Sequence, residues 1–263
     1  MRLKKLLTGV MLLTVCATSY AHTPYLAPYS FDESSQDNVT LDAAFAEKFF
    51  VPELAFNNSI FTVITPNGET INPDNVVKLH LRMVVEHQLK EEGTYRFSTG
   101  KRLGRVFKMY EINGVRKSLE NPMDAIPEGG KLLAFFQSLT LAESYVTKGA
   151  PSETALKPYG QGLEFIAKSH PNELFVGERL SMVSVFNGKP LADLTVDVFQ
   201  ANDQFSNDKP SISLKSNDKG EFSFMPQKQG VYLLRARYKS DAPKGSPAPQ
   251  ISNTYTLVVE ATE

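Results

Sequence analysis

The sequence predicts an all-β protein with two β-sandwich modules in tandem, of the Ig-like or transthyretin-like Greek-key type. Past residue 21, almost every segment is a short run of β-branched and aromatic residues that ends at Gly, Pro, Asn or Asp, as strands closed by turns do. Roughly the last 100 residues hold about six or seven such runs, which is the number expected of one sandwich. No repeat with a period of about 20–50 residues is visible, so a solenoid or propeller is not indicated.

The first module, residues 22–160, is expected to consist of strands joined by hairpin turns. Asn67-Gly68 and Asn113-Gly114 are turn sequences, since Asn and Gly adopt positive φ angles at low cost. Residues Lys131–Tyr145 fit either a helix or strands, because their apolar residues have helical spacing whereas Ser144-Tyr145-Val146-Thr147 is strand-like. The other strands are expected at residues 39–45, 61–65, 76–89, 94–97 and 104–112.

The second module, residues 161–263, follows a change in composition. Gly and Pro alternate with polar residues between Gly149 and Gly162, which is typical of a linker or domain boundary. Asn187-Gly188 and Asp218-Lys219-Gly220 then separate alternating apolar segments. The strands of this module are expected at residues 180–186, 194–199, 211–214, 221–225, 231–234 and 254–259.

Residues 1–21 have the features of a secretory signal peptide. Three cations precede the apolar run Leu6–Val15, and Ser19-Tyr20-Ala21 places small residues where a signal peptidase reads them. The run is too short to span a bilayer. We therefore expect a periplasmic protein, residues 22–263. The single cysteine of the whole sequence, Cys16, lies inside the signal peptide. The mature chain is therefore expected to have no disulfide and no thiolate chemistry.

The charge of the chain limits its partners. The whole sequence has a formal net charge of −1, and loss of the three signal cations leaves −4. Without an excess of cations, nucleic acid and anionic membranes are not favoured by composition. We also expect no membrane insertion after removal of the signal.

His22 is the first candidate metal ligand. Cleavage after Ala21 would give His22 both a free α-amine and an imidazole, which together can close a chelate ring around a metal ion. Two such nitrogens suit Cu(II) or Ni(II). Pro24 has no N–H, so a site made from successive deprotonated backbone amides cannot form. The alternative is a solvated terminus that happens to begin with His.

Two further histidines are candidate ligands. Strand alternation puts His87 on the apolar face of its strand, where it is either a core histidine bonded to a carbonyl or a second metal ligand. His170 precedes Pro171 at the start of the second module, where it either shapes an extended turn or lines an inter-domain site. His80 shares its face with charged residues and is expected at the surface. Glu47 is one of a few carboxylates that could add to the site.

The sequence favours a protein that is not an enzyme. It has no Gly-x-Ser-x-Gly elbow, no His-Glu-x-x-His motif and no phosphate-binding loop. It also has no tryptophan, and therefore no Trp platform for stacking on sugars.

Six stretches of the sequence together resemble a known family. They are His22–Pro28, Glu92–Arg96, Leu163–Phe165, Phe186–Leu191, Asp218–Gly220 and Gly230–Tyr232. The chain is similar to secreted Gram-negative proteins that contain a domain of unknown function and are described as the periplasmic component of cobalt/nickel uptake systems (the NikM-like soluble part). The resemblance implies a two-part all-β protein that binds a transition metal through His22 and partners an inner- or outer-membrane metal transporter. The C-terminal part would be a carboxypeptidase-regulatory-like sandwich. The chain departs from the integral-membrane members of these uptake systems, because no transmembrane segment follows the sandwich in this sequence.

We therefore expect a periplasmic protein that captures Ni, Co or Cu, with His22 as the principal ligand and His87 or His170 completing the site. Two alternatives remain open. One is a copper-dependent oxidative enzyme with an N-terminal histidine brace. The other is a structural or adaptor module of the cell envelope that binds no metal.

Overall fold

The structure is a computed structural model that describes residues 22–34, 36–201 and 210–263. In these residues nearly all regular structure is β, with one 3-10 turn, η1, at Thr154–Leu156, so the all-β tandem-sandwich prediction is confirmed. The predicted signal peptide, with Cys16, lies outside the described residues. The described part of the chain contains no helix that could cross a membrane.

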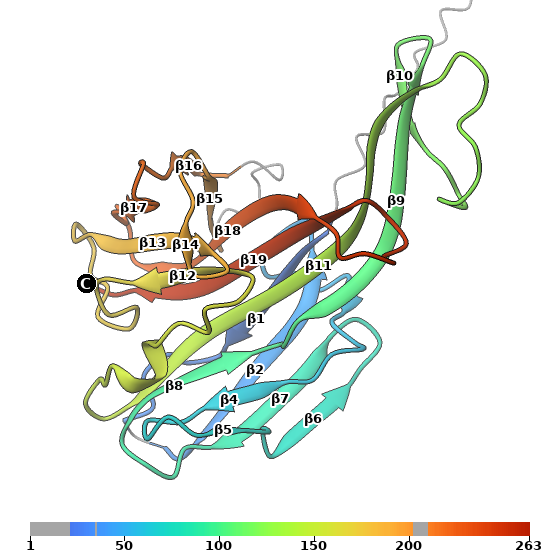
Figure 1. The fold of residues 1–263 in the computed structure, drawn as a ribbon. Helices are drawn as coiled ribbons and strands as arrows, with labels where there is room; N and C mark the ends of the chain where they lie inside the picture. Colours follow the sequence, from blue (N-terminus) through green and yellow to red (C-terminus); the bar gives the residue numbers. More distant parts are fainter. Residues whose placement is uncertain (1–21, 35, 202–209) are drawn as a thin grey trace, which may run out of the picture.

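The strands follow one another along the whole described chain (Figure 1). They are β1 (Thr23–Pro28), β2 (Asn38–Ala46), β3 (Leu54–Ala55), β4 (Thr62–Ile64), β5 (Thr70–Ile71), β6 (Asn75–Lys78), β7 (Met83–Gln88), β8 (Gly93–Ser98), β9 (Arg102–Ile112), β10 (Val115–Ser118), β11 (Lys131–Lys148), β12 (Leu163–Ala167), β13 (Leu180–Phe186), β14 (Lys189–Pro190), β15 (Thr195–Gln200), β16 (Ile212–Lys215), β17 (Glu221–Phe224), β18 (Gly230–Asp241) and β19 (Gln250–Ala261).

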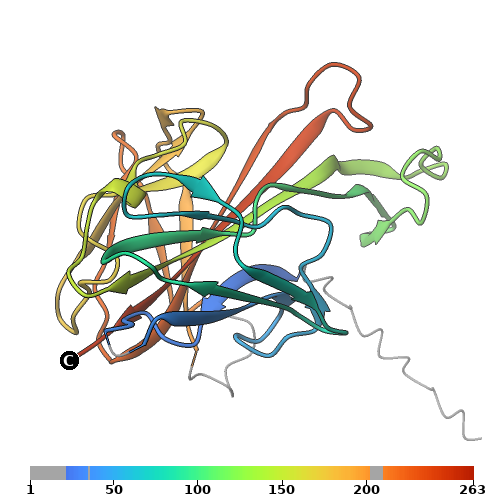
Figure 2. The same cartoon turned by 90° about the horizontal axis from the view of Figure 1, so that it is seen from below.

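These strands form three sheets. The first sheet has the order β1-β2-β7-β6, with β3 paired to β2. The central sheet has the order β16-β15-β18-β19-β11-β8-β4-β5, and β9 and β10 extend it from β11. The third sheet has the order β12-β13-β14, with β17 paired to β13. Figure 2 shows the same arrangement from below, with the ends of the long strands projecting from the body.

The central sheet lies between the other two, because successive side chains of a strand point to opposite faces. In β11, Ala142 and Val146 join the core shared with β2 and β7, whereas Leu141 and Tyr145 join the core shared with β12 and β13. A smaller cluster around Tyr25 and Val258 packs the first sheet onto β18 and β19. Each outer sheet thus buries one face against the same central sheet.

The long strand β11 resolves the ambiguous segment. Lys131–Lys148 is a single strand, and it pairs with β19 in parallel as well as with β8 and β9 in antiparallel. The central sheet therefore runs across the boundary predicted near residue 160, since β11 lies before it and β19 after it. The division into residues 22–160 and 161–263 stays a prediction.

A buried ion pair lies between the central and third sheets. Arg96 of β8 and Glu143 of β11 are almost completely buried, and their Nη2 and Oε2 atoms are 2.5 Å apart. Tyr255 and Tyr159 donate their hydroxyls to Glu143 at 2.7 and 2.9 Å. Burial, with the charge of Glu143 adding to it, raises the pKa of Tyr159 and Tyr255 far above the usual value. Both phenols therefore remain protonated donors to the carboxylate.

The second carboxylate of this cluster belongs to Glu164. Its oxygens accept the backbone N–H groups of Tyr159 and Gly160 at 2.9 and 2.8 Å. The guanidinium of Arg96 also stacks 4.1 Å from the centre of the Tyr159 ring and donates to the Lys157 carbonyl. The segment that connects the two cores is thereby held by the same cluster.

Candidate metal centre

His22 lies where the chain enters β1, next to the loop that follows β2. Antiparallel pairing places Thr23 opposite Ala46, so His22 falls beside Glu47. The loop then returns, because Phe45 pairs with Leu54 and the Glu53 N–H donates to the Phe45 carbonyl. Register alone therefore brings the two ends of the loop to the first residue of the proposed mature chain.

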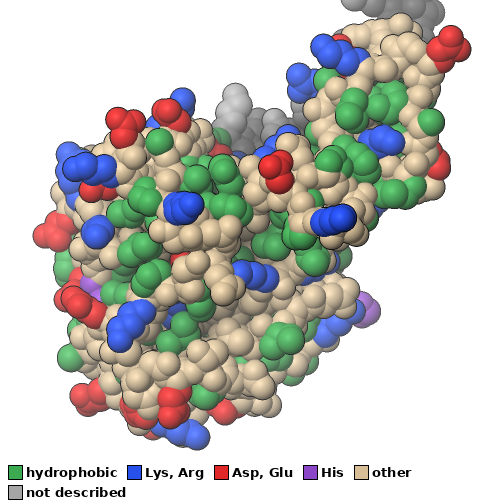
Figure 3. Space-filling model, viewed as in Figure 1, with side chains coloured by type: hydrophobic (Ala, Val, Ile, Leu, Met, Phe, Trp, Pro, Cys, Tyr) green, Lys and Arg blue, Asp and Glu red, His purple; other side chains and the backbone are tan. Residues whose placement is uncertain are grey.

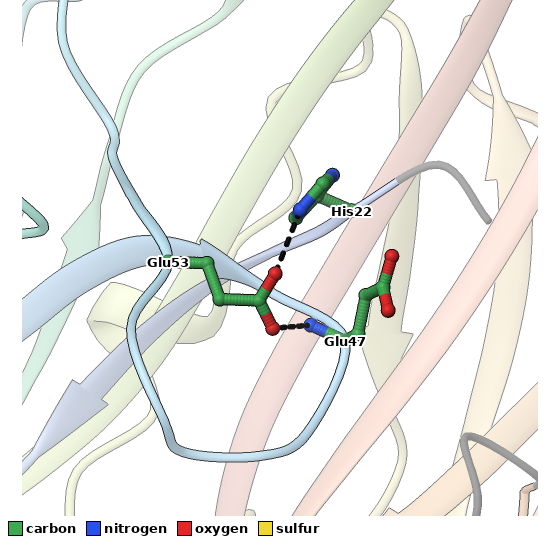
Figure 4. Close-up of side chains that lie close together, drawn as sticks. All are labelled: His22, Glu47 and Glu53. Atoms are coloured by element: carbon green, nitrogen blue, oxygen red, sulfur yellow. Dashed lines mark hydrogen bonds and ion pairs between the residues drawn. The ribbon is translucent and has the colours of Figure 1, made fainter. Parts of the chain in front are cut away.

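Three side chains meet at this point (Figure 4). The His22 Nε2 atom is 2.7 Å from Glu53 Oε2, and the other Glu53 oxygen accepts the Glu47 N–H at 3.0 Å. One ligand atom from each of His22, Glu47 and Glu53 lies within 4.8 Å of the others. We call these three residues the His22 cluster.

Aromatic packing holds the loop between Glu47 and Glu53. Phe49 and Phe50 both contact the Tyr25 ring edge to face, with centroids 6.4 and 4.9 Å away. Phe49 also contacts Phe199 of β15, with centroids 5.2 Å apart. Pairs of this kind add to the stabilisation from burial. The loop that carries the two carboxylates is thus tied to strands of two sheets.

The cluster is open to solvent. The side chains of His22 and Glu53 are 44% and 36% exposed. A metal ion could therefore bind these groups and dissociate from them without any unfolding of the hydrophobic core. A structural metal site, in contrast, is closed on all sides by protein ligands.

The chemistry of an N-terminal histidine decides which ring nitrogen a chelate would use. A metal bound by the α-amine and Nδ1 closes a six-membered ring, whereas Nε2 points away from the amine. In this structure Nε2 already faces Glu53. A carboxylate bonded to the second ring nitrogen is the usual support of a metal-binding histidine, since it fixes the tautomer and orientation of the ring. The observed contact therefore fits metal binding at Nδ1.

His87 does not join this cluster. It pairs with Val39 at the start of β2, while His22 lies beyond Ala46 at the other end. Seven residues of strand separate these positions by about 23 Å. His87 is buried between the rings of Tyr95 and Phe97, and its Nδ1 lies 3.0 Å from the partly exposed Asp74.

His170 does not join the cluster either. Its Nε2 lies 3.0 Å from Thr94 Oγ1 and 3.3 Å from the Ser152 carbonyl, and its Nδ1 accepts the Asn172 N–H at 3.2 Å. Both ring nitrogens are thus occupied by protein groups. Thr94 belongs to β8 and points to the opposite face from Tyr95, beside which His87 lies. The structure therefore separates all three predicted ligands from one another.

The cluster also contains a residue that the sequence patterns did not single out. Glu47 is among the carboxylates named from sequence, but Glu53 has no periodicity or motif to mark it. The signal that could have found it is the pairing of β2 with β3, which depends on a two-residue strand. Short strands of this kind leave little trace in a sequence.

Burial of His87 predicts a stability change with pH. Burial lowers the pKa of His87, while Asp74 acts in the opposite direction. A free histidine protonates near pH ~6.5, so below this pH the unfolded chain binds more protons than the folded one. We expect the free energy of unfolding to fall between pH 7 and pH 5, and to fall less in His87→Leu. Urea titrations of both proteins at pH 7 and pH 5 measure the free energy of unfolding. His170, whose pKa burial also lowers, is present in both proteins and contributes equally to each. An equal fall in both proteins would contradict the assignment.

Comparison with known proteins gives one sequence family and several remote structural likenesses. The family described as a domain of unknown function, DUF4198, matches residues 19–240. No curated protein matches the chain significantly.

The solved structures include the D0-D1 domain of intimin, which is 12% identical, with a TM-score of 0.24, over 90% of this chain and 97% of that one. The Yersinia pseudotuberculosis adhesin InvE is 11% identical, with a TM-score of 0.23, over 89% of this chain and 58% of that one. The Clostridium thermocellum CbhA fibronectin(III)-like modules are 8% identical, with a TM-score of 0.20, over 90% and 94%. Likenesses this remote carry no argument about function.

Proposed function

From the premise that this chain belongs to the DUF4198 family of unknown function, we propose that it is a periplasmic metal-binding protein that captures Ni(II), Co(II) or Cu(II). It would hold the ion at His22 and hand it on to a membrane transporter, without catalysis. The observation that supports this proposal best is the 2.7 Å contact between His22 Nε2 and Glu53.

Each member of the His22 cluster has a distinct task in this proposal. His22 supplies its α-amine, freed by cleavage after Ala21, and its Nδ1. Glu53 accepts the Nε2 proton, orients the ring and raises its basicity. Glu47 supplies a nearby negative charge and an oxygen donor. Two nitrogens and a carboxylate, with no thiolate in the mature chain, suit borderline divalent ions better than Cu(I).

The exposure of the cluster supports capture rather than permanent retention. Few protein ligands and an open side leave positions for water or for a ligand from an acceptor protein. An ion held in this way can pass to a partner by stepwise ligand exchange. The second and third predicted ligands, His87 and His170, have no part in this version of the site.

The experiment is a calorimetric titration of the mature protein, His22–Glu263, with Ni(II), Co(II) and Cu(II). We expect Glu53→Gln to weaken binding by about 10-fold or more, the cost typical of losing the partner of a ligating histidine. Glu178→Gln is the matched control, because Glu178 is an exposed glutamate of the second module. Affinity in Glu53→Gln equal to that in Glu178→Gln would refute the role of Glu53.

A Glu47→Gln variant distinguishes two modes of binding. If Nδ1 and the amine hold the ion, Glu47→Gln lowers affinity less than removal of the amine does. If Nε2 and both carboxylates hold it instead, the two glutamine variants lose affinity equally and the free amine is dispensable.

A further inference from the structure

The two edges of the first sheet differ in how well they are covered. β1, at one edge, is buried at five of its six residues, and its Pro24 carbonyl accepts the Thr256 hydroxyl of β19 at 3.0 Å. β6, at the other edge, is exposed at all four of its residues (Figure 1). An exposed edge strand offers its unpaired backbone groups to a further strand. The first sheet is therefore open to extension at β6.

The segment around β6 also exposes large apolar side chains. Val76 and Val77 of β6 are 41% and 51% exposed, and Leu79 and Leu81 in the following turn are 43% and 52% exposed. Ile71 of the neighbouring β5 is 37% exposed. In Figure 3 green apolar side chains reach the surface at the lower right of the body, where Figure 1 places β6. Such a concentration is typical of an interaction site.

The pairing with β7 determines which backbone groups of β6 are free. Hydrogen-bonded and non-hydrogen-bonded residue pairs alternate along an antiparallel ladder. The Leu79 N–H donates to the Arg82 carbonyl at 2.8 Å, so the odd-numbered residues of β6 are the ones that bond with β7. The even-numbered residues, Val76 and Lys78, with Asp74 directly before the strand, thus turn their N–H and C=O groups away from β7. No backbone hydrogen bond among the described residues occupies these groups.

The same three residues carry opposite charges at their two ends. Lys78 is exposed, and in the described part of the chain it forms no ion pair within 4.0 Å. Asp74 is 46% exposed, and its Oδ2 accepts the Gln88 N–H at 2.7 Å and faces His87. Its Oδ1 has no hydrogen bond within the described residues. The order acid, Val76, lysine is self-complementary when two copies run antiparallel.

We propose that β6 pairs with β6 of a second copy of this chain, antiparallel and around a two-fold axis at Val76. Each Asp74 then lies opposite the partner's Lys78, on the same face of the joined sheet. This register uses every outward backbone group, since three hydrogen-bonded residue pairs give about six hydrogen bonds. The interface is isologous, as in most homodimers. The first sheets of the two copies become one continuous sheet.

The charge of Lys78 favours this partner over other strands. A lysine on an edge strand discourages pairing in general, because its charge must find a counter-charge on the incoming strand. A shift of two residues in the pairing would place Lys78 opposite the partner's Val76 and leave both charges unmatched. The β6 edge, which we define as Asp74, Val76 and Lys78, thus selects its own sequence in one register.

The proposed dimer leaves the His22 cluster free. The cluster lies beside β1 and the end of β2, whereas β6 is at the opposite edge of the same sheet. Metal binding and dimer formation can therefore succeed or fail separately. An interface of one short strand from each copy is small, so the dimer should dissociate reversibly on dilution.

The first experiment is sedimentation equilibrium of the mature protein, His22–Glu263, at concentrations up to about 100 μM, where we expect a reversible monomer–dimer equilibrium. Val76→Pro should raise the dissociation constant about 30-fold, because each copy loses one intermolecular N–H donor. The variant should still fold, since this N–H faces solvent in the monomer and proline is tolerated at such positions of edge strands. A mature protein that stays monomeric throughout would overturn the proposal, and so would an unchanged dissociation constant in Val76→Pro.

A charge reversal tests the match between Asp74 and Lys78. Lys78→Glu should raise the dissociation constant about 10-fold or more, because two attractive cross-strand pairs become repulsive. The matched control is Lys215→Glu, which reverses an exposed lysine on β16, the strand at the end of the central sheet. Equal dissociation constants for the two variants would overturn the assigned register.

Cysteine cross-linking tests the position of the two-fold axis. The mature chain has no cysteine, so Val76→Cys and Val77→Cys each introduce a single thiol. At the axis the two Cα atoms of residue 76 lie about 5.5 Å apart, within the range of a disulfide. We expect mild oxidation to give a covalent dimer of Val76→Cys and little of Val77→Cys. A covalent dimer of Val77→Cys alone, or equal yields from both variants, would contradict an axis at Val76.

Discussion

Addition of one alanine in front of His22 is expected to weaken Ni(II) or Cu(II) binding by on the order of 100-fold or more. Removal of a hydrogen-bond partner of a metal ligand typically costs about 10- to 100-fold in affinity, and removal of a ligand itself should cost at least as much. The extension leaves the imidazole, Glu53 and Glu47 in place. It converts the α-amine into an amide, which neither binds a metal readily nor closes a chelate ring with Nδ1. Calorimetric titration of the extended and the mature proteins measures the difference.

Two controls accompany this prediction. An alanine added after Glu263 changes the length of the chain equally and should leave affinity unaltered. His80→Ala removes an exposed histidine in the turn between β6 and β7 and should also have no effect. If the alanine before His22 changes affinity no more than the alanine after Glu263, the chelate proposal fails, and the Nε2 mode described above becomes the one to test.

The Arg96→Met variant is expected to lose about 3–5 kcal/mol of stability, the usual cost of leaving one partner of a buried ion pair without its counter-charge. Glu143 would then be a fully buried carboxylate that keeps, among the described residues, the hydroxyl donors Tyr159 and Tyr255. Urea unfolding at pH 7 measures the loss, and the m-value shows whether unfolding stays cooperative.

A double variant tests whether the loss of stability comes from the unpaired charge of Glu143 or from the lost packing of the Arg96 side chain. Arg96→Met/Glu143→Gln replaces both charges, so the loss should be smaller than the sum of the two single losses. Arg102→Met serves as a comparison, because Arg102 is a less buried arginine of the next strand that stacks on Phe45 and Phe56. A loss of no more than about 1 kcal/mol in Arg96→Met is the range of an exposed ion pair. Such a result would contradict the prediction that the buried Arg96–Glu143 pair stabilises the fold.

Much of the architecture follows from local sequence. At Asn113-Gly114 and Asn187-Gly188 all four residues have positive φ, between 51° and 75°, and both turns join antiparallel strands as predicted. Alternation in β7 places His87 on the buried face, where it is 3% exposed. His80 is exposed as expected, but it lies in the turn between β6 and β7 rather than in the continuous strand predicted over residues 76–89. Such features depend on residues close together in the chain, and side-chain periodicity reports them directly.

The arrangement of the candidate site depends on contacts that local sequence does not carry. The segment Lys131–Lys148, which local sequence left open between helix and strand, forms β11 because its distant partners β8 and β19 supply its hydrogen bonds. His22 meets Glu53 because β2 pairs with both β1 and the two-residue β3, and the same register keeps His87 at the far end of β2. Sequence by itself determined the all-β class, the turns and His22 as the candidate chelator. Tertiary structure decided which carboxylates lie beside His22, because only long-range strand register sets which residues become neighbours.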